Sequence, residues 1–278
     1  MAEASAGAFA DLMKAFRARR GLSQLQLASV TGYSQRHISF LELGRSSPTR
    51  TAVLVLADAL CETLEARNAL LRAARFADEY PASPLDGGEL ELALDACRRT
   101  LKALRPFPAV LIDRQWTVLG ANRTAMAFFG QFQTARSRWT GHAANGMRTH
   151  FEPKGLRPYI VNWPEVAQHF MVRVRLRLLA EPANAVAAGI VRDFGGEVDG
   201  LAADHPRLPP SAGEAAFTIA LRKGRRQYRY QTLFSAFSDP QDITAAQLTI
   251  ESFVPADDAT REHFLDLERE TAAADEGK

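Results

Sequence analysis

Cysteine is scarce in this 278-residue chain, which has only Cys61 and Cys97. Both lie among apolar residues in helical patterns, which favours two buried free thiols in a reducing compartment. Two cysteines alone cannot form a zinc cluster. The six histidines are scattered without HxxxH or HxH spacing and without an acidic cluster beside them. We therefore expect no metal site.

Catalytic motifs are also missing. The sequence has no nucleophile elbow and no glycine-rich phosphate loop, because Gly195-Gly196 lacks the spacing of one. No constellation of residues supports an enzyme, and we expect no cofactor. Long apolar runs are absent too: none approaches the ~18 residues that a membrane-spanning helix needs, and charges interrupt the N-terminus before a signal-peptide core can form. These absences favour a cytoplasmic protein that is not an enzyme.

The charge is small in total but uneven along the chain. The net charge is +2, and residues 1–76 carry +4 against −2 for the remainder. This asymmetry is the sign expected of a small DNA-binding region attached to a near-neutral body.

Residues 7–76 have the pattern of five short helices. Phe9, Leu12, Met13 and Phe16 form one apolar stripe at helical spacing. Serines at positions 23 and 34 stand where they can cap the second and third helices, and glycines follow the first and third. We therefore predict an all-α domain over residues 1–77.

The segment 22–60 resembles the lambda-repressor-like (XRE) helix-turn-helix family, and the resemblance extends over residues 9–76. The matching positions are Ser23-Gln24, Leu27-Ala28, Gly32, Ser34, Ile38, Glu42-x-Gly44-Arg45, Pro48 and the Leu56-Ala57 to Leu60 run. The resemblance implies that Arg17 and Glu42 form a largely buried salt bridge that supports the fold. It also implies that the third helix enters the major groove of DNA, in a homodimer that binds two half-sites.

The residues expected to contact DNA are the polar side chains around the third helix. Gln can bond adenine and Arg can bond guanine, whereas Phe40 either touches a thymine methyl or packs back on the domain. The alternative for each residue is an ordinary surface side chain or a helix cap. The predicted set is Ser23, Gln24, Ser34, Gln35, Arg36, His37, Ser39, Phe40 and Arg45.

Beyond residue 77 the pattern changes. Residues 78–88 have the composition of a linker, residues 89–270 form the second domain, and residues 271–278 read as a disordered tail. The pattern of residues 89–270 predicts a helix, then two short strands joined by a turn at residues 113–115. Several helices and three antiparallel strands follow. We expect an α+β fold with a five-stranded antiparallel sheet and helices on one face, an order similar to PAS domains. One short helix should end at Gly195-Gly196, before a loop over residues 197–213.

Residues 105–130 resemble the start of the MmyB-like regulator ligand-binding domain. The shared features are an apolar strand, an Asp turn, a strand led by Trp, an Asn and an Ala/Phe-rich helix closed by Gly, and fragments at 145–153 and 162–167 agree. The family's His-Pro stretch is replaced here by Ala220-Leu221-Arg222-Lys223-Gly224, which puts the ligand mouth in doubt. The resemblance implies a PAS-like domain that holds a fatty acid or a related small apolar ligand.

Such a ligand needs apolar and aromatic walls and a polar partner for its head group. Each candidate is open to a second interpretation, as core for the aromatic residues and as a helix cap for Asn122. The candidates are Trp116, Asn122, Phe128, Arg148, Trp163, Phe170, Met171, Arg173, Tyr228, Tyr230 and Phe234. The sequence thus predicts a DNA-binding transcription regulator controlled by a small apolar ligand. The alternative is a regulator whose second domain only dimerises or docks a partner protein and binds no small molecule.

Overall fold

The computed structural model describes residues 2–132, 145–204 and 216–276. The chain divides into two compact units. One contains Met1–Leu90 together with Ser238–Ala246, and the other contains Glu91–Phe237 and Gln247–Lys278.

The N-terminal unit begins with five helices in succession. They are α1 (Ala2–Arg19), α2 (Gln24–Thr31), α3 (Gln35–Glu42), α4 (Arg50–Leu60) and α5 (Leu64–Ala73). The side-chain oxygens of Ser23, Ser34, Thr49 and Thr63 each accept a backbone N–H in the first turn of the helix that follows. Apolar residues from all five helices, including Met13, share one core. The predicted helical domain is confirmed.

Residues 79–83 are held on this unit by specific hydrogen bonds. The side chain of Asn68, which is 1% exposed, donates to the carbonyl of Tyr80 and accepts from the N–H groups of Glu79 and Tyr80. Helix α11 (Ile243–Ala246) adds two bonds: Ile243 N–H donates to Pro81 O over 2.7 Å, and Ser83 N–H donates to the Asp242 carboxylate over 3.1 Å. The segment that the sequence suggests as a linker is therefore ordered along residues 79–83.

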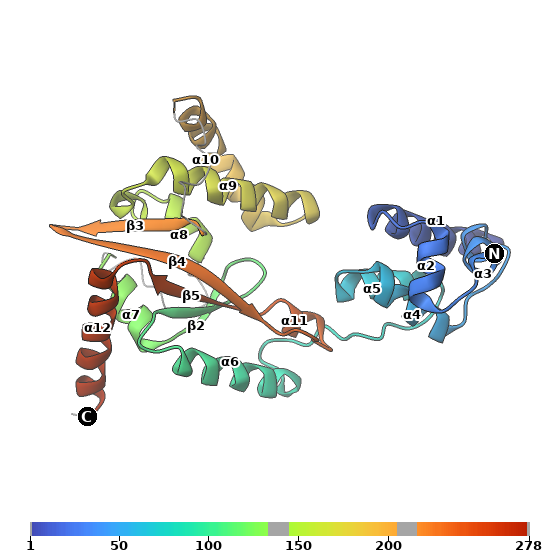
Figure 1. The fold of residues 1–278 in the computed structure, drawn as a ribbon, viewed down its shortest axis with the longest axis horizontal. Helices are drawn as coiled ribbons and strands as arrows, with labels where there is room; N and C mark the ends of the chain where they lie inside the picture. Colours follow the sequence, from blue (N-terminus) through green and yellow to red (C-terminus); the bar gives the residue numbers. More distant parts are fainter. Residues whose placement is uncertain (1, 133–144, 205–215, 277–278) are drawn as a thin grey trace. The chain divides into compact units, whose positions relative to one another are not determined.

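The second unit is built on an antiparallel sheet. Its strands are β1 (Ala109–Ile112), β2 (Val118–Ala121), β3 (Thr218–Lys223), β4 (Arg226–Ala236) and β5 (Thr249–Pro255), in the order β2-β1-β5-β4-β3 (Figure 1). Gly224 has φ +58° in the turn between β3 and β4, a conformation that glycine adopts without strain. The predicted five-stranded antiparallel sheet is confirmed.

Helices cover both faces of this sheet, which corrects the expectation of one covered face. Helix α6 (Glu91–Ala103) packs Cys97 and Leu101 on Leu111 and Ile250. On the opposite face, α7 (Arg123–Gly130), α8 (Gly146–Phe151), α9 (Trp163–Ala180) and α12 (Asp258–Glu276) enclose the main core. Side chains alternate along a strand, so Val110 and Leu111 serve different faces. The side chains on both faces of the sheet are apolar, so both faces must pack against helices to be buried.

Helix α10 corrects a second expectation. It extends from Ala185 to Asp204, through Gly195-Gly196 and into the predicted loop. Val198 is buried in the core, and Asp199 pairs with Arg175 of α9 over 2.8 Å. The packing of α10 on α9 therefore outweighs the ~1 kcal/mol by which each glycine disfavours a helix. Helix α12 likewise continues to Glu276, within the stretch expected to be a disordered tail.

The remaining expectations concern metals and membranes. Within the ranges described above, no three His, Cys, Asp or Glu side chains come together as a metal site would require. None of the described helices is long and apolar enough to cross a membrane.

Candidate DNA interface and ligand pocket

Helix α3 presents its N-terminal turn on the surface of the first unit. Gly32, with φ +74°, makes the turn from α2 to α3, and Ser34 Oγ accepts the N–H of His37 over 3.1 Å. Ile38 and Leu41 are fully buried and fix the inner side of the helix. The outer side is thereby left free for contact.

The outer side of α3 carries the residues predicted to read bases. Gln35 and Arg36 are exposed, and Ser39 and Phe40 are half-buried. The Arg36 guanidinium lies 5.0 Å from the centre of the Phe40 ring. Phe40 therefore supports Arg36 through a cation–π contact while keeping part of its ring accessible. The His37 ring lies 5.0 Å from that of Tyr33.

The remaining residues predicted to contact DNA differ in whether their side chains already form hydrogen bonds within the protein. Ser23 and Gln26 form a capping box at the start of α2, with the Ser23 hydroxyl engaged by the Gln26 N–H. The Gln24 amide donates to Glu42 over 2.8 Å, so its side chain is tied to the scaffold rather than extended. Arg45 is exposed just beyond α3.

Glu42 is the centre of a buried ionic network. Its two oxygens accept hydrogen bonds from Arg17 at 2.5 and 2.9 Å, and its side chain is 3% exposed. Arg17 also donates to the carbonyl of Leu22. Desolvation raises the pKa of Glu42, but the bonds from Arg17 and Gln24 outweigh it and leave this pKa below its usual value. The pair thus joins α1 to α3 and fixes the position of α3.

The second unit contains a small internal cavity of about 20 Å³ between the sheet and helices α8 and α9. A cavity of this size holds about one water molecule. Most of its wall is apolar, formed by Val110, Ile112, Trp116, Val118, Gly146, Met147, Phe170 and Phe253. Three predicted ligand residues, Trp116, Phe170 and Arg173, are therefore brought together here.

Three ionisable side chains complete the cavity wall: Arg173, Glu251 and His150. Burial raises the pKa of Glu251 to about 7 and lowers that of His150 to about 4. Burial also lowers the pKa of Arg173, although the charge of Glu251 acts in the other direction. In the described part of the chain, no ion pair joins Arg173 to Glu251. Such polar groups in an apolar cavity are typical of a binding site.

Trp116 reaches the cavity from a strained position on the chain. Its φ is +61°, in the left-handed region that large side chains rarely adopt. The Asp113 carboxylate holds the turn by accepting the N–H groups of Gln115 and Thr117, each over 2.8 Å. Such strain concentrates at functional sites.

An aromatic cluster lies on the same face of the sheet but outside the cavity wall. Phe128 is fully buried, with its ring centre 5.5 Å from Tyr228 and 6.1 Å from Tyr230. The Tyr230 hydroxyl is buried and has no hydrogen-bond partner among the described residues. Met171 is buried in the same core. These residues act as core in this structure.

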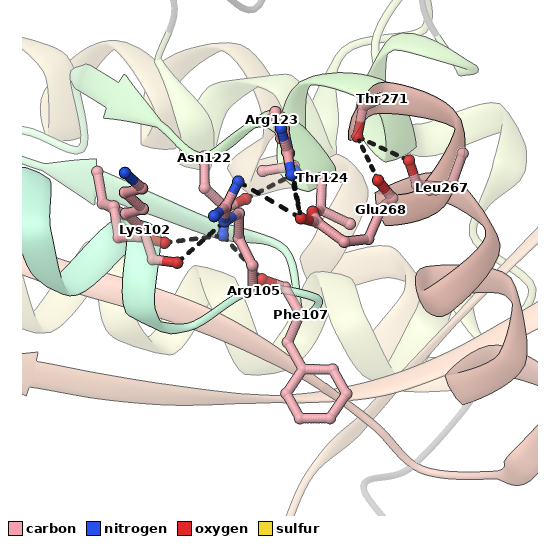
Figure 2. Close-up of polar contacts among 11 residues, drawn as sticks. Lys102, Arg105, Phe107, Asn122, Arg123, Thr124, Leu267, Glu268 and Thr271 are labelled. Atoms are coloured by element: carbon pink, nitrogen blue, oxygen red, sulfur yellow. Dashed lines mark hydrogen bonds and ion pairs between the residues drawn. The ribbon is translucent and has the colours of Figure 1, made fainter. Parts of the chain in front are cut away.

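Asn122 is occupied as a helix cap. Its amide oxygen accepts the N–H groups of Ala125 and Ala109, and its nitrogen donates to the carbonyl of Leu101. The same nitrogen also donates to the carbonyl of Phe107, which Figure 2 labels beside Asn122. All its bonding capacity is used, which leaves none for a ligand. The same view shows Glu268 of α12, whose carboxylate forms ion pairs with Arg105 and Arg123 and accepts a hydrogen bond from the Thr124 hydroxyl. Because Arg123 and Thr124 belong to α7, these contacts fix α7 to α12.

Three further candidates lie away from the cavity wall. Arg148 is paired with Glu152 and Asp193. Trp163 stacks under Arg157, and its indole Nε1 is buried without a hydrogen-bond partner in the described residues. Phe234 is 46% exposed and lies beside Arg173, whose guanidinium is 4.8 Å from its ring centre.

Of the three ionisable cavity residues, Glu251 and His150 were not among the ligand residues predicted from the sequence. Glu251 had a usable signal, because it alternates with Phe253 on the inward face of an apolar strand. A carboxylate at an inward position is unusual without a partner. His150 lies on a six-residue helix, which is too short for a clear periodic pattern.

Comparison with known families gives two matches. Residues 8–70 match the model of a helix-turn-helix domain, and residues 94–267 match that of the MmyB-like transcription regulator ligand binding domain. Neither matched family is one of enzymes. No curated protein gives a significant match to the chain.

The second match extends over more than half of the chain and includes the whole cavity wall. The first includes α3 and the network around Glu42. The chain therefore belongs to the MmyB-like transcription regulators and joins a helix-turn-helix DNA-binding domain to the ligand-binding domain of that family.

Proposed function

We propose that the protein is a homodimeric, sequence-specific transcription regulator of the XRE type that reads DNA with α3 and responds to a small apolar, fatty-acid-like ligand in the cavity beside Arg173. The observation that carries the ligand half of this proposal is the cavity wall itself. It combines apolar side chains with Arg173, Glu251 and His150, which have no ion pair to one another in the described residues. Burying such groups is unfavourable unless a partner completes them.

The cavity requires a conformational change for a complete ligand to enter. About 20 Å³ holds about one water molecule, so even a polar head group needs the cavity wall to move. Phe170 and Phe234 beside Arg173 are the side chains placed to move. A ligand then favours the open arrangement and shifts the population of the sensor toward it.

The same small volume supports the alternative function. If the core stays filled, the second unit serves only for dimerisation or for docking a partner protein. Mass spectrometry of the purified, denatured protein separates the two functions. We expect a co-purified apolar molecule, or binding of an added one that Arg173→Gln weakens. Protein that neither carries nor binds such molecules would favour the alternative.

The DNA half of the proposal rests on the exposed outer side of α3. Replacing Gln35 and Arg36 together by Ala should remove the preference for the selected operator by about 2–6 kcal/mol, because each bidentate base contact contributes about 1–3 kcal/mol. Binding is measured by fluorescence anisotropy against specific and scrambled duplexes.

The matched control for this experiment is Arg72→Ala. Arg72 is an exposed cation on α5 whose pair with Asp78 contributes little to stability. The control should retain operator preference and thermal stability. Operator preference that survived the double substitution would show that α3 is not the reading helix.

A further inference from the structure

The hydrogen-bonding groups of the cavity are not those that an ionised carboxylate requires. Arg173 offers donors, but Glu251 and His150 offer acceptors. His150 Nδ1 lies 2.7 Å from the carbonyl oxygen of Gly146, which can only accept. In the neutral imidazole Nδ1 therefore carries the hydrogen, and the buried Nε2, which has no described partner, is an acceptor.

Arg173 is oriented by the two rings beside it. Its guanidinium lies 5.8 Å from the centre of Phe170 and 4.8 Å from that of Phe234. Rings that take the guanidinium face leave its in-plane N–H groups available for hydrogen bonds. Because Arg173 also lines the cavity, these donors are accessible to a ligand there.

When Glu251 is ionised, its charge and that of Arg173 balance each other in the cavity. Arg173 and Arg177 on α9, His150 on α8 and Tyr230 on β4 are the titratable or charged groups that act on Glu251 or on its neighbour Arg173. Arg177 lies over the Trp116 ring and pairs with Glu181, which offsets its charge. An anionic ligand would leave an uncompensated negative charge beside Glu251, which is costly in a buried site.

We propose that the ligand of this cavity has a neutral carboxamide-type head group, whose carbonyl accepts from Arg173 and whose N–H groups donate to Glu251 and His150 Nε2. A primary amide supplies one acceptor and two donors, which is the complement of this wall. A carboxylate supplies acceptors only. This inference rests on the proposed ligand-binding function and narrows the ligand to a carboxamide attached to an apolar tail.

The test compares matched pairs of straight-chain ligands that differ only in the head group: the amides and the acids of six, eight and ten carbons. Binding to the full chain is measured by titration calorimetry at pH 6 and pH 8. At pH 8 we expect each bound amide to bind at least tenfold more tightly than its acid. The acid should bind about tenfold more tightly at pH 6 than at pH 8, because protonated Glu251 can donate to it.

Glu251→Gln replaces one acceptor oxygen of this wall group by an NH2 donor and removes its charge, without changing its size. It should strengthen binding of the acid, weaken binding of the amide and remove the pH dependence of the acid. Arg175→Gln is the control, since Arg175 lies on the same helix, pairs with Asp199 at the surface and does not line the cavity. Circular dichroism verifies that both variants fold.

Two results would overturn the inference, and they are distinguishable. Acids that bind as tightly as amides at pH 8, with no effect of Glu251→Gln, would reject the carboxamide head group while leaving a ligand-controlled regulator in place. Failure of every acid and amide to bind the folded wild-type chain at either pH would reject both the head group and the ligand-binding function of this cavity.

Discussion

At the scale of single residues, the sensor cavity places two titrations in opposition. His150 has a pKa near 4 in the folded chain, below the ~6.5 of an exposed imidazole, so the stability it contributes is present above about pH 6.5 and is lost as the pH falls toward 4. Glu251 has a pKa near 7, above the usual ~4.3, so its contribution is full below about pH 4.3 and is lost as the pH rises through 7.

Single substitutions should separate these two opposite dependences of the free energy of unfolding on pH. With Glu251→Gln, stability should rise between about pH 4.5 and 6.5, and with His150→Asn it should fall over the same range, each by at most about 1.4 kcal/mol per pH unit. The wild type should change less than either variant. Urea unfolding followed by tryptophan fluorescence suits this test, because the sequence has no tryptophan before Trp116, and Trp116 and Trp163 belong to the second unit. Parallel curves for all three proteins would contradict the assigned pKa directions.

At the scale of elements, helix α10 is held by its neighbours despite an unfavourable sequence. A Cβ at Gly196 would meet nothing within 4 Å, and the position is helical. Gly196→Ala should therefore stabilise the second unit by about 0.4–1 kcal/mol, through lower entropy of the unfolded chain and better helix propensity. The midpoint of urea unfolding measures the effect.

Gly155→Ala is the matched control for this prediction. A Cβ there would collide with the backbone carbonyl of Thr149, so the same substitution should destabilise the unit. If Gly196→Ala destabilised it to a similar extent, α10 would not continue through the glycine pair.

At the scale of the whole molecule, the proposed homodimer makes a prediction about DNA recognition. One α3 helix reaches only a few base pairs, so specificity requires a second head on the adjacent half-site. Light scattering should give twice the 30.6 kDa of one chain, and sequences selected from random DNA should contain two half-sites about 10 base pairs apart. Adding about 5 base pairs between half-sites should weaken binding more than adding a full turn, because half a turn places the second site on the opposite side of the duplex. A monomer that binds one half-site with full affinity would contradict this arrangement.

Local patterns made much of this molecule predictable. The helix caps at Ser23 and Ser34 and the alternation along β5 depend on residues near one another in sequence. The pairing of Arg17 with Glu42 was implied by the family resemblance. Such signals determine where helices begin, which faces are apolar and where strands pair. They were sufficient for the helical domain, the five strands and the two families.

Only the tertiary structure decided the rest. Tertiary packing places α6 on the second face of the sheet and allows α10 to continue through two glycines. It also brings Arg173, Glu251 and His150 together in one cavity, from α9, β5 and α8 respectively. It also assigned Asn122 to a cap and Gln24 to Glu42. These outcomes depend on contacts between segments far apart in sequence, whose energies exceed local propensity. The sequence by itself thus determined a helix-turn-helix domain and the fold of the ligand-binding domain, and packing determined which polar groups line the cavity.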